Sequence, residues 1–332
     1  MSVEAMMRRR PLGRTELKIA PLSLGAAPLG QVYGQVDEQQ GIRMVHEALD
    51  QGMNLIDTSP YYGITRSEQM LGQALDGVAR DRYVLCTKAG RYGDQEFDFS
   101  RERILSSVHE SLQRLGTDYA DIVLLHDIEF GDLRTVLDEG IPALQQLKEQ
   151  GTIRYYGVSC LPLDGYRIVL EHTDLDVILS YCHYTLNDST LVDLLPMLEQ
   201  RGVGIMNAAP LSMGLLSDQG PASWHPASSQ MRQLSLQAAV LCAEHGTSLP
   251  KLAVQYALSN PALTTTIVGT SSVEELTANL TYASEPINEV LLTKVLNLLR
   301  PIQGQSWATG HWTEEVLNGS HSLRWEGSPF HK

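Results

Sequence analysis

Short apolar runs alternate with stretches of helical periodicity along most of this sequence. Eight apolar runs have the length of strands, near residues 22–25, 53–57, 83–88, 121–126, 153–159, 176–181, 203–208 and 265–269. Helical spacing is found near residues 37–51, 66–76, 101–115, 132–150, 164–172, 188–201, 249–259 and 273–282. The apolar runs are continuous, which is typical of parallel strands buried on both faces. Eight strands alternating with helices predict a (β/α)8 barrel, the TIM barrel.

Three segments lie outside this alternation. Residues 12–22 contain a turn sequence between apolar residues and predict an N-terminal β-hairpin on the barrel floor. Residues 211–247 form a long connection between the seventh strand and its helix, with an extra helix near 229–245. Connections this long are usually functional or disordered. We expect a single domain with these bounds: 1–332 for the whole, 11–300 for the barrel core and 301–332 for a C-terminal extension.

The composition restricts the partners and the compartment. The chain has 332 residues, 43% of them hydrophobic, and a net charge of −14. This charge disfavours nucleic acid and anionic membranes, which attract surfaces rich in Lys and Arg. No apolar run reaches the ~18 residues of a membrane span, and the basic start lacks the apolar core of a signal peptide. We expect a cytoplasmic monomer or homodimer without nucleic-acid or membrane partners, whose free thiols are Cys86, Cys160, Cys182 and Cys242.

Polar side chains stand at the ends of three successive predicted strands. Asp57 ends the second strand, Lys88 the third and His126 the fourth, and Tyr62 follows Asp57 in a turn. The carboxyl ends of parallel strands meet at one end of a barrel, where barrel enzymes hold their catalytic groups. A lone Asp at a strand end is more often a helix cap, and a lone His is more often a packing residue. The occurrence of all four residues together favours an active site.

These four residues match, in order and context, the catalytic tetrad of the aldo-keto reductases. The runs at 57–63, 126–131, 179–184 and 224–228 resemble the L-galactose dehydrogenase branch of that family, and the resemblance extends from residue 11 to about 307. It implies NAD(P)-dependent oxidation of the C1 hydroxyl of an aldose, such as L-galactose or L-fucose, to the lactone. Two alternatives stay open. One is a broad-specificity NADPH-dependent aldehyde or ketone reductase, and the other is a cofactor-sensing binding subunit.

The resemblance implies a role for each residue of the tetrad. Tyr62 transfers the proton of the substrate oxygen while a hydride passes between the substrate and nicotinamide. An unperturbed tyrosine has a pKa of about 10, and we expect the nearby Lys88 ammonium to lower it. Asp57 pairs with Lys88, and His126 hydrogen-bonds the substrate oxygen that Tyr62 reaches. Tyr61 stands beside Tyr62, but the order of the family motif favours Tyr62.

The cofactor prediction rests mainly on residues 267–279. No G-x-G-x-x-G or G-x-x-x-x-G-K-[ST] loop joins a strand to a helix, so neither a Rossmann fold nor a P-loop fits. Residues 267–279 resemble the pyrophosphate and adenosine motif of the aldo-keto reductases and open a helix, whose N-terminus suits an anion. The alternative is an ordinary turn and helix cap. The predicted cofactor-binding residues are Gly25, Asp57, Ser159, Ser180, Pro210, Leu211, Gly214, Gly269, Thr270, Ser271, Glu275 and Asn279.

We predict that NAD is preferred over NADP. NADPH-preferring relatives place an arginine where our alignment has Glu275, and Glu274 adds a second carboxylate. Carboxylates repel a 2′-phosphate and accept hydrogen bonds from a free 2′-hydroxyl. The sequence also lacks the usual tyrosine at 208–211 that stacks on nicotinamide, and Ser180 is a candidate partner for the nicotinamide amide.

Polar residues near the predicted barrel mouth suit a polyhydroxylated substrate better than an apolar aldehyde. Each of them alone is more often a loop or packing residue, so the sugar assignment rests mainly on the resemblance. The predicted substrate-binding residues are Tyr62, His126, Asp127, His183 and Trp307. No H-x-H or H-E-x-x-H spacing is present, so we predict no metal site.

Overall fold

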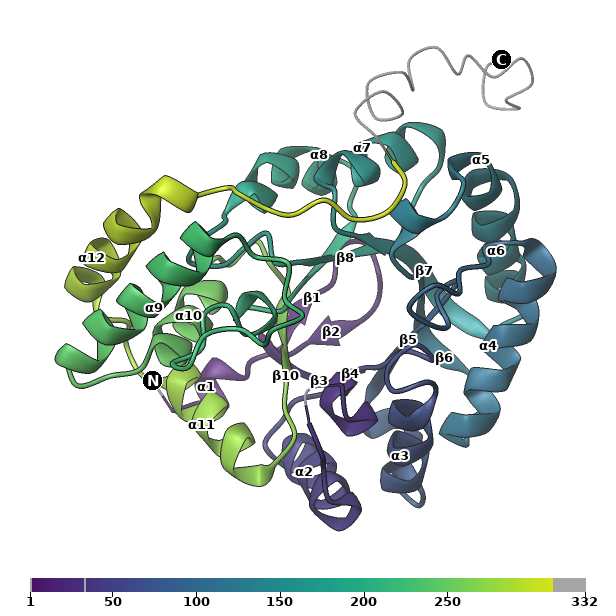
Figure 1. Cartoon of the computed structure of the whole chain (residues 1–332). Coiled ribbons are helices and arrows are strands. Elements are labelled where there is room, and N and C mark those ends of the chain that lie inside the picture. The colour runs from purple at the N-terminus through teal and green to yellow at the C-terminus, as the bar shows by residue number, and fades with distance from the viewer. Residues whose placement is uncertain (1, 33, 313–332) are drawn as a thin grey trace.

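Eight parallel strands close into a barrel in the computed structural model, which describes residues 2–32 and 34–312 (Figure 1). The strands follow chain order around the barrel, and the last pairs with the first. They are β3 (Leu22–Gly25), β4 (Leu55–Asp57), β5 (Val84–Ala89), β6 (Ala120–Leu125), β7 (Ile153–Cys160), β8 (Val177–Tyr181), β9 (Gly204–Ala208) and β10 (Thr265–Gly269). The predicted (β/α)8 barrel is confirmed. The end of the predicted C-terminal extension, 313–332, lies outside the described residues.

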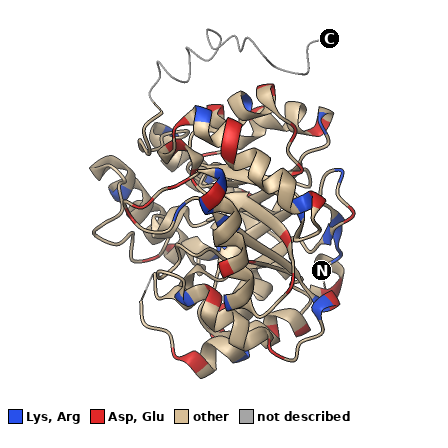
Figure 2. Ribbon diagram, turned by 90° about the vertical axis from the view of Figure 1, so that its right-hand side faces the viewer, with Lys and Arg blue, Asp and Glu red and all other residues tan. Residues whose placement is uncertain are grey.

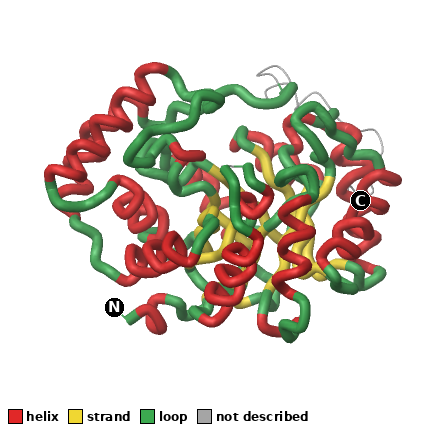
Figure 3. The backbone as a smooth tube through the Cα atoms, turned by 60° about the horizontal axis from the view of Figure 1, so that its bottom comes forward, coloured by secondary structure: helices red, strands yellow, loops and turns green. Residues whose placement is uncertain are grey.

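Helices surround the strands as an outer layer (Figure 3). The barrel helices are α2 (Glu38–Asp50), α3 (Arg66–Leu75), α4 (Arg101–Leu115), α6 (Ile141–Glu149), α7 (Leu163–His172), α8 (Leu195–Gln200), α10 (Leu249–Leu258) and α11 (Val273–Ser284). The extra helix predicted in the long connection is α9 (Ser229–Glu244). Two α-helices of the structure were not predicted from the sequence, α1 (Val3–Met6) and α12 (Glu289–Leu299).

Two of the predicted helices change their hydrogen-bonding pattern near the start. The helix predicted at 132–150 begins as α5 (Leu133–Thr135), continues through a π-helical turn at Val136–Gly140 and becomes α6. The helix predicted at 188–201 begins with a 3-10 turn at Thr190–Leu194 before α8. Both helices are therefore present, and each has an irregular turn near its start.

An N-terminal hairpin closes the floor of the barrel. β1 (Arg10–Pro11) pairs in antiparallel fashion with β2 (Lys18–Ile19). Leu12 and Ile19 are fully buried and belong to the same apolar cluster as barrel residues such as Leu55. The predicted hairpin is confirmed, and it leaves the carboxyl ends of the strands as the open mouth.

Charged residues and buried cysteines occupy different parts of the fold. Lys, Arg, Asp and Glu residues lie mostly on the outer helices and loops (Figure 2). Across the described ranges, no helix combines the length and the apolar character needed to cross a bilayer. The four cysteines are buried and form no disulfide.

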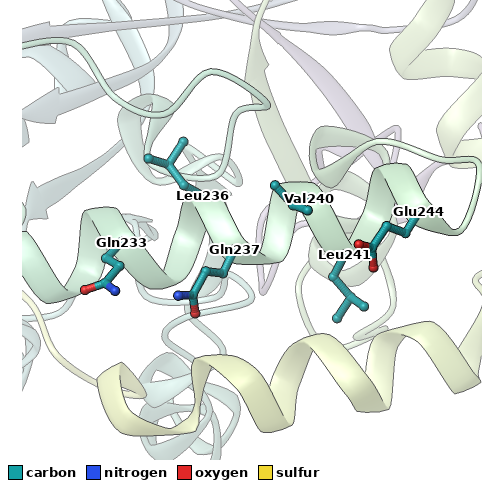
Figure 4. Close-up of a pocket in the computed structure, with 6 residues that line it drawn as sticks. All are labelled: Gln233, Leu236, Gln237, Val240, Leu241 and Glu244. Carbon is teal, nitrogen blue, oxygen red and sulfur yellow. The ribbon is translucent and has the colours of Figure 1, made fainter.

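A shallow groove lies on the exposed side of α9, away from the predicted site (Figure 4). Its volume is about 430 Å³. Leu236 and Val240, which are 43% and 59% exposed, contribute its apolar surface. None of the predicted catalytic, cofactor or substrate residues is among those that line it, so the groove is separate from the barrel mouth.

The chain beyond α12 crosses back over the mouth end of the barrel (Figure 1, yellow). We call residues 303–312 the C-terminal strap. The backbone N–H of His311 donates a hydrogen bond to the carbonyl oxygen of Glu129 (2.7 Å). Trp312 is buried, and its ring N–H donates to the carbonyl oxygen of Gly131 (2.8 Å). The strap is therefore fixed to the loop that follows β6.

The Glu129 carboxyl group is buried beneath this strap. Its Oε1 atom accepts hydrogen bonds from the Leu161 N–H and the Thr309 hydroxyl, both at 3.0 Å, while Oε2 has no partner among the described residues. Burial, together with the nearby Asp127 carboxylate, raises the pKa of Glu129 from 4.5 to about 8. The folded protein therefore keeps a proton here at pH values where the unfolded chain has lost it.

The substitution Glu129→Gln tests this linkage. The raised pKa of Glu129 contributes to the free energy of unfolding. This contribution is complete below pH 4.5, the pKa in the unfolded chain, and is lost as the pH rises through about 8. Within this window we expect the free energy of unfolding of wild type to fall, relative to Glu129→Gln, by up to about 1.4 kcal/mol per pH unit in urea titrations. Glu149→Gln, at an exposed position of α6, should follow wild type. Parallel pH profiles for wild type and Glu129→Gln would contradict the assignment.

Candidate active site

The four predicted catalytic residues lie together at the carboxyl ends of β4, β5 and β6. Asp57 is the last residue of β4, Lys88 is one residue before the end of β5, and His126 directly follows β6. These strands are neighbours in the barrel, so their ends lie side by side. Tyr62 comes from the loop after β4, and its ring contacts both Lys88 and His126. The structure therefore brings the four side chains to one place.

The loop that holds Tyr62 is packed backbone against backbone. Gly63 follows Tyr62 and has φ of 65°, in the left-handed region that favours glycine. A Cβ atom at Gly63 would lie 2.0 Å from the carbonyl oxygen of Gly30. Only glycine fits here without moving the loop, and this close contact fixes the position of the Tyr62 backbone.

Lys88 and Asp57 form a buried ion pair. The Lys88 Nζ atom lies 2.8 and 2.7 Å from the two carboxylate oxygens of Asp57, and 2.8 Å from the carbonyl oxygen of Thr58. The Lys88 side chain is only 1% exposed. Burial by itself would lower the pKa of the ammonium, but Asp57 and then Tyr62 raise it above its ordinary value. Lys88 therefore stays charged and is held in one position.

The pKa of Tyr62 departs from the expectation. The Lys88 Nζ atom lies 4.7 Å from the centroid of the Tyr62 ring. Burial raises the pKa of Tyr62 above its ordinary value, Lys88 opposes this shift, and Asp57 adds to it. The expected lowering is therefore wrong for the chain by itself. Lys88 acts in the expected direction, but Asp57 offsets its charge and the phenol is desolvated, so Tyr62 is a protonated phenol here.

His126 is held as a neutral ring between charged groups. Burial, Lys88 and Arg91 lower its pKa well below 6.5. Its Nδ1 atom lies 3.0 Å from the Oγ atom of Ser59. The ring meets that of Tyr62 edge-on, with centroids 5.6 Å apart and planes at 89°. A neutral imidazole has one N–H group, so His126 can donate one hydrogen bond to a substrate oxygen near Tyr62.

Arg91 forms a second ion pair, with Asp127, beside His126. Arg91 was not among the residues predicted from the sequence. It follows the end of β5, so a search for polar residues just after each strand could have found it. Its guanidinium carbon lies 3.8 Å from the centroid of the Tyr61 ring. Burial raises the pKa of Asp127, and Arg91 opposes this shift. The Arg91 Nε and Asp127 Oδ1 atoms have no hydrogen-bond partner in the described part of the chain.

Two other predicted substrate residues make their main contacts within the protein. Both ring nitrogens of His183 are engaged, Nδ1 with the Asp188 carboxylate (3.0 Å) and Nε2 with the Leu161 carbonyl oxygen (2.7 Å). The Trp307 ring packs against His225, with centroids 5.0 Å apart. His183 thus supports the turn after β8, and Trp307 anchors the strap. Their predicted contact with substrate stays a prediction.

Several predicted cofactor residues lie at the mouth ends of adjacent strands. Gly25 and Gly269 end β3 and β10 and are paired in register. Ser159 is one residue before the end of β7. Asn279, on α11, donates a hydrogen bond to the Thr270 hydroxyl (3.4 Å). In residues 2–32 and 34–312, no group of three or more His, Cys, Asp or Glu side chains is placed to hold a metal ion.

Two buried polar atoms at this end of the barrel lack partners. Ser180 on β8 and Asn207 on β9 are paired in register, and both are fully buried. The Ser180 Oγ and Asn207 Oδ1 atoms have no hydrogen-bond partner among the described residues. Buried polar groups are normally paired, so unpaired ones call for a ligand or water. The flanking residues Leu179 and Met206 belong to the apolar cluster inside the barrel, so Ser180 and Asn207 face the surrounding helices. A contact between Ser180 and the nicotinamide amide stays a prediction.

The loop after β9 has an unusual backbone. It contains the predicted cofactor residues Pro210, Leu211 and Gly214. Positive φ angles occur at three of its other residues, Ala209 (53°), Ser212 (46°) and Met213 (52°). Such angles are unfavourable for residues with a Cβ atom, and strain of this kind is concentrated at functional sites. The loop is held by His225, whose Nε2 atom lies 2.9 Å from the Ser212 carbonyl oxygen.

Glu275 occupies the N-terminal end of α11. Ser272 caps this helix by accepting a hydrogen bond from the Glu275 N–H (3.2 Å). The Glu275 Oε2 atom in turn accepts hydrogen bonds from the N–H and hydroxyl groups of Ser271, both at 2.8 Å. A carboxylate is therefore already present where the helix N-terminus would attract an anion.

Comparison with known proteins agrees with this geometry. Residues 21–295 match the model of the aldo/keto reductase family. L-galactose dehydrogenase of Arabidopsis thaliana is 46% identical over 310 residues, which are 91% of this chain and 97% of the relative. D-arabinose 1-dehydrogenase of Saccharomyces cerevisiae is 38% identical over 276 residues, 78% of this chain and 81% of the relative.

A solved structure supports the same relationship. The holo form of the aldo-keto reductase AKR11C1 from Bacillus halodurans superposes with a TM-score of 0.73 at 27% sequence identity. The match covers 91% of this chain and 99% of that structure. The family match includes Asp57, Tyr62, Lys88 and His126, so the candidate site lies within the shared region.

Proposed function

The chain belongs to the aldo/keto reductase family and is an NAD(P)-dependent oxidoreductase, and we propose that it oxidises the C1 hydroxyl of an aldose, such as L-galactose or L-fucose, to the lactone. The observation that supports this most is the meeting of Tyr62, His126 and the Lys88–Asp57 pair at one end of the barrel. The relatives named L-galactose dehydrogenase and D-arabinose 1-dehydrogenase support an aldose as the substrate.

Tyr62 transfers the proton in this proposal. It accepts the proton of the substrate hydroxyl during oxidation and returns it during reduction. His126 donates a hydrogen bond to the same oxygen and orients it. Lys88, held by Asp57, stabilises the negative charge on the Tyr62 oxygen when the proton is absent. The nicotinamide ring, when bound in its oxidised form, supplies the carbon that accepts a hydride and a positive charge that favours the Tyr62 phenolate.

The residues that would hold the cofactor are at the same end of the barrel. Gly269 ends β10 and Ser271 lies between β10 and α11, where backbone N–H groups suit the pyrophosphate. The Ser271 N–H would exchange its hydrogen bond to Glu275 for one to the pyrophosphate.

The Arg91–Asp127 pair supports a polyhydroxylated substrate. It lies next to the catalytic histidine, with the Asp127 Oδ2 atom 3.7 Å from His126 Nε2. A charged donor and a charged acceptor beside the reacting oxygen suit the hydroxyl groups of a sugar, which both donate and accept hydrogen bonds. An apolar aldehyde would leave the buried Arg91 Nε and Asp127 Oδ1 atoms, which have no partner among the described residues, still unpaired.

The position of Glu275 supports NAD over NADP. Its carboxylate is bound to Ser271 at the start of α11, where a 2′-phosphate would have to share the helix N-terminus with it. The Glu275 carboxylate would repel a 2′-phosphate bound beside it, whereas a 2′-hydroxyl can donate a hydrogen bond to this carboxylate.

The second candidate is a broad-specificity NADPH-dependent aldehyde or ketone reductase. One observation favours it, the raised pKa of Tyr62, since reduction needs a protonated phenol as the acid. Absorbance of the reduced nicotinamide distinguishes the two. NADH formation with L-galactose or L-fucose supports the dehydrogenase, and NADPH consumption with simple aldehydes, without sugar oxidation, supports the reductase.

The substitution Tyr62→Phe should lower the turnover number for sugar oxidation by about 100-fold or more, because it removes the proton-transfer group. The measurement is NADH formation with L-galactose, L-fucose, D-galactose and D-arabinose, together with NAD binding, which should be unchanged. Tyr61→Phe is the matched control, since the Tyr61 hydroxyl donates to Asp94 (2.9 Å) and takes no part in the tetrad. Near-normal turnover of Tyr62→Phe would remove Tyr62 from this role.

Glu275 can be tested with two substitutions. Glu275→Gln keeps an oxygen to accept the hydrogen bonds of Ser271 but removes the charge, and Glu275→Arg reverses the charge. We expect the ratio of kcat/KM for NADP to that for NAD to rise roughly tenfold, about 1.4 kcal/mol, in Glu275→Gln and further in Glu275→Arg. An unchanged ratio in both variants would show that Glu275 does not face the 2′-position.

A further inference from the structure

Ser59 is a buried serine that contacts the catalytic histidine. It lies in the loop between β4 and α3, three residues before Tyr62, and is fully buried. Its Oγ atom lies 3.0 Å from the Nδ1 atom of His126 and 3.1 Å from the backbone nitrogen of Tyr61. In the described part of the chain these are its two hydrogen-bond partners.

The hydrogens in this group can be assigned by elimination. The Tyr61 N–H can only donate, so Ser59 Oγ accepts that hydrogen bond. If His126 Nδ1 also donated to Ser59, the serine hydroxyl hydrogen would have no acceptor in a buried site, which is unfavourable. The hydroxyl therefore donates to Nδ1, and the ring hydrogen of neutral His126 lies on Nε2.

The other side of the ring leads to the same assignment. The Asp127 Oδ2 atom lies 3.7 Å from His126 Nε2 and is paired with Arg91. A nearby carboxylate oxygen favours a hydrogen on the nitrogen that faces it. At 3.7 Å the contact is too long for a hydrogen bond, so the Nε2–H group stays available.

We propose that Ser59 is a positioning residue that fixes the Nε2–H tautomer of His126, so that this nitrogen always presents a donor to the substrate oxygen. The inference rests on the proposed function of His126. The opposite tautomer would turn a lone pair toward that oxygen and repel it. Because burial, Lys88 and Arg91 keep the ring neutral, protonation of both nitrogens does not supply the donor instead.

The alternative is a purely structural role for Ser59. A serine hydroxyl that accepts from the N–H two residues later forms a common local turn, and Ser59 makes this contact with Tyr61. Ser67 provides a matched control for such a role. It is equally buried, and its hydroxyl donates to the Ala26 carbonyl oxygen (2.7 Å) without contacting His126. A structural role predicts similar behaviour for the two serines, whereas the proposed role does not.

The first readout needs no activity. Long-range ¹H–¹⁵N correlation on the full-length protein with labelled histidine reports which ring nitrogen of His126 is protonated, and His126→Asn identifies the signal. We expect the Nε2–H form in wild type and Ser67→Ala, a mixture or the Nδ1–H form in Ser59→Ala, and Nε2–H again in Ser59→Thr, which restores the hydroxyl. An Nδ1–H ring in wild type, or a pure Nε2–H ring in Ser59→Ala, would overturn the proposal.

The second readout is kinetic. We expect Ser59→Ala to lower kcat for sugar oxidation about tenfold, less than the loss of a donor outright, with the KM for the cofactor unchanged and partial rescue in Ser59→Thr. Ser67→Ala should keep its kcat, and an equal loss of kcat in the two alanine variants would overturn the proposal. If wild type oxidises no sugar, the proposed function fails. The tautomer of His126 is still determined by the ¹H–¹⁵N correlation, so the two failures can be distinguished. If Ser59→Ala does not fold, the wild-type tautomer and Ser59→Thr still decide the question.

Discussion

The candidate site depends on one buried ion pair, Lys88 with Asp57. Removing two charges from water is unfavourable unless their geometry and hydrogen bonds are nearly ideal. The barrel provides that geometry, because β4 and β5 are adjacent strands whose register is fixed by the closed sheet. The pair in turn holds the charged Lys88 ammonium beside the Tyr62 ring. The closed barrel and the candidate active site are thus connected through this ion pair.

His126 lies between two ion pairs, and this explains how a neutral ring can persist among so many charges. Lys88 and Arg91 both disfavour the imidazolium form, and burial disfavours it further. Asp127, which could have stabilised that form, is engaged by Arg91 instead. In the proposed mechanism this arrangement separates two tasks, because the lysine holds the charge and the histidine donates the hydrogen bond.

The barrel and the grouping of Asp57, Tyr62, Lys88 and His126 could be predicted because both follow from local pattern, continuous apolar strands that end in polar residues. Residues whose role arises from contacts between separate loops could not be predicted in this way. Ser59 looks like an ordinary loop residue until His126 is placed beside it. The direction of the Tyr62 pKa was predicted wrongly because a pairwise argument includes the charge of Lys88 but omits burial. The preference for NAD remains a prediction.

The contact between Glu275 and Ser271 has a consequence for the rate of cofactor exchange. An amide at a helix N-terminus that had no partner would hold a phosphate group strongly and release it slowly. Here the Ser271 amide already has a carboxylate partner within its own chain. An anion that bound here would replace the Glu275 carboxylate and, on leaving, be replaced by it, so neither step would leave the Ser271 N–H without a protein or anion partner. An internal competitor of this kind lowers the barrier to dissociation and suits an enzyme that must renew its cofactor in every turnover.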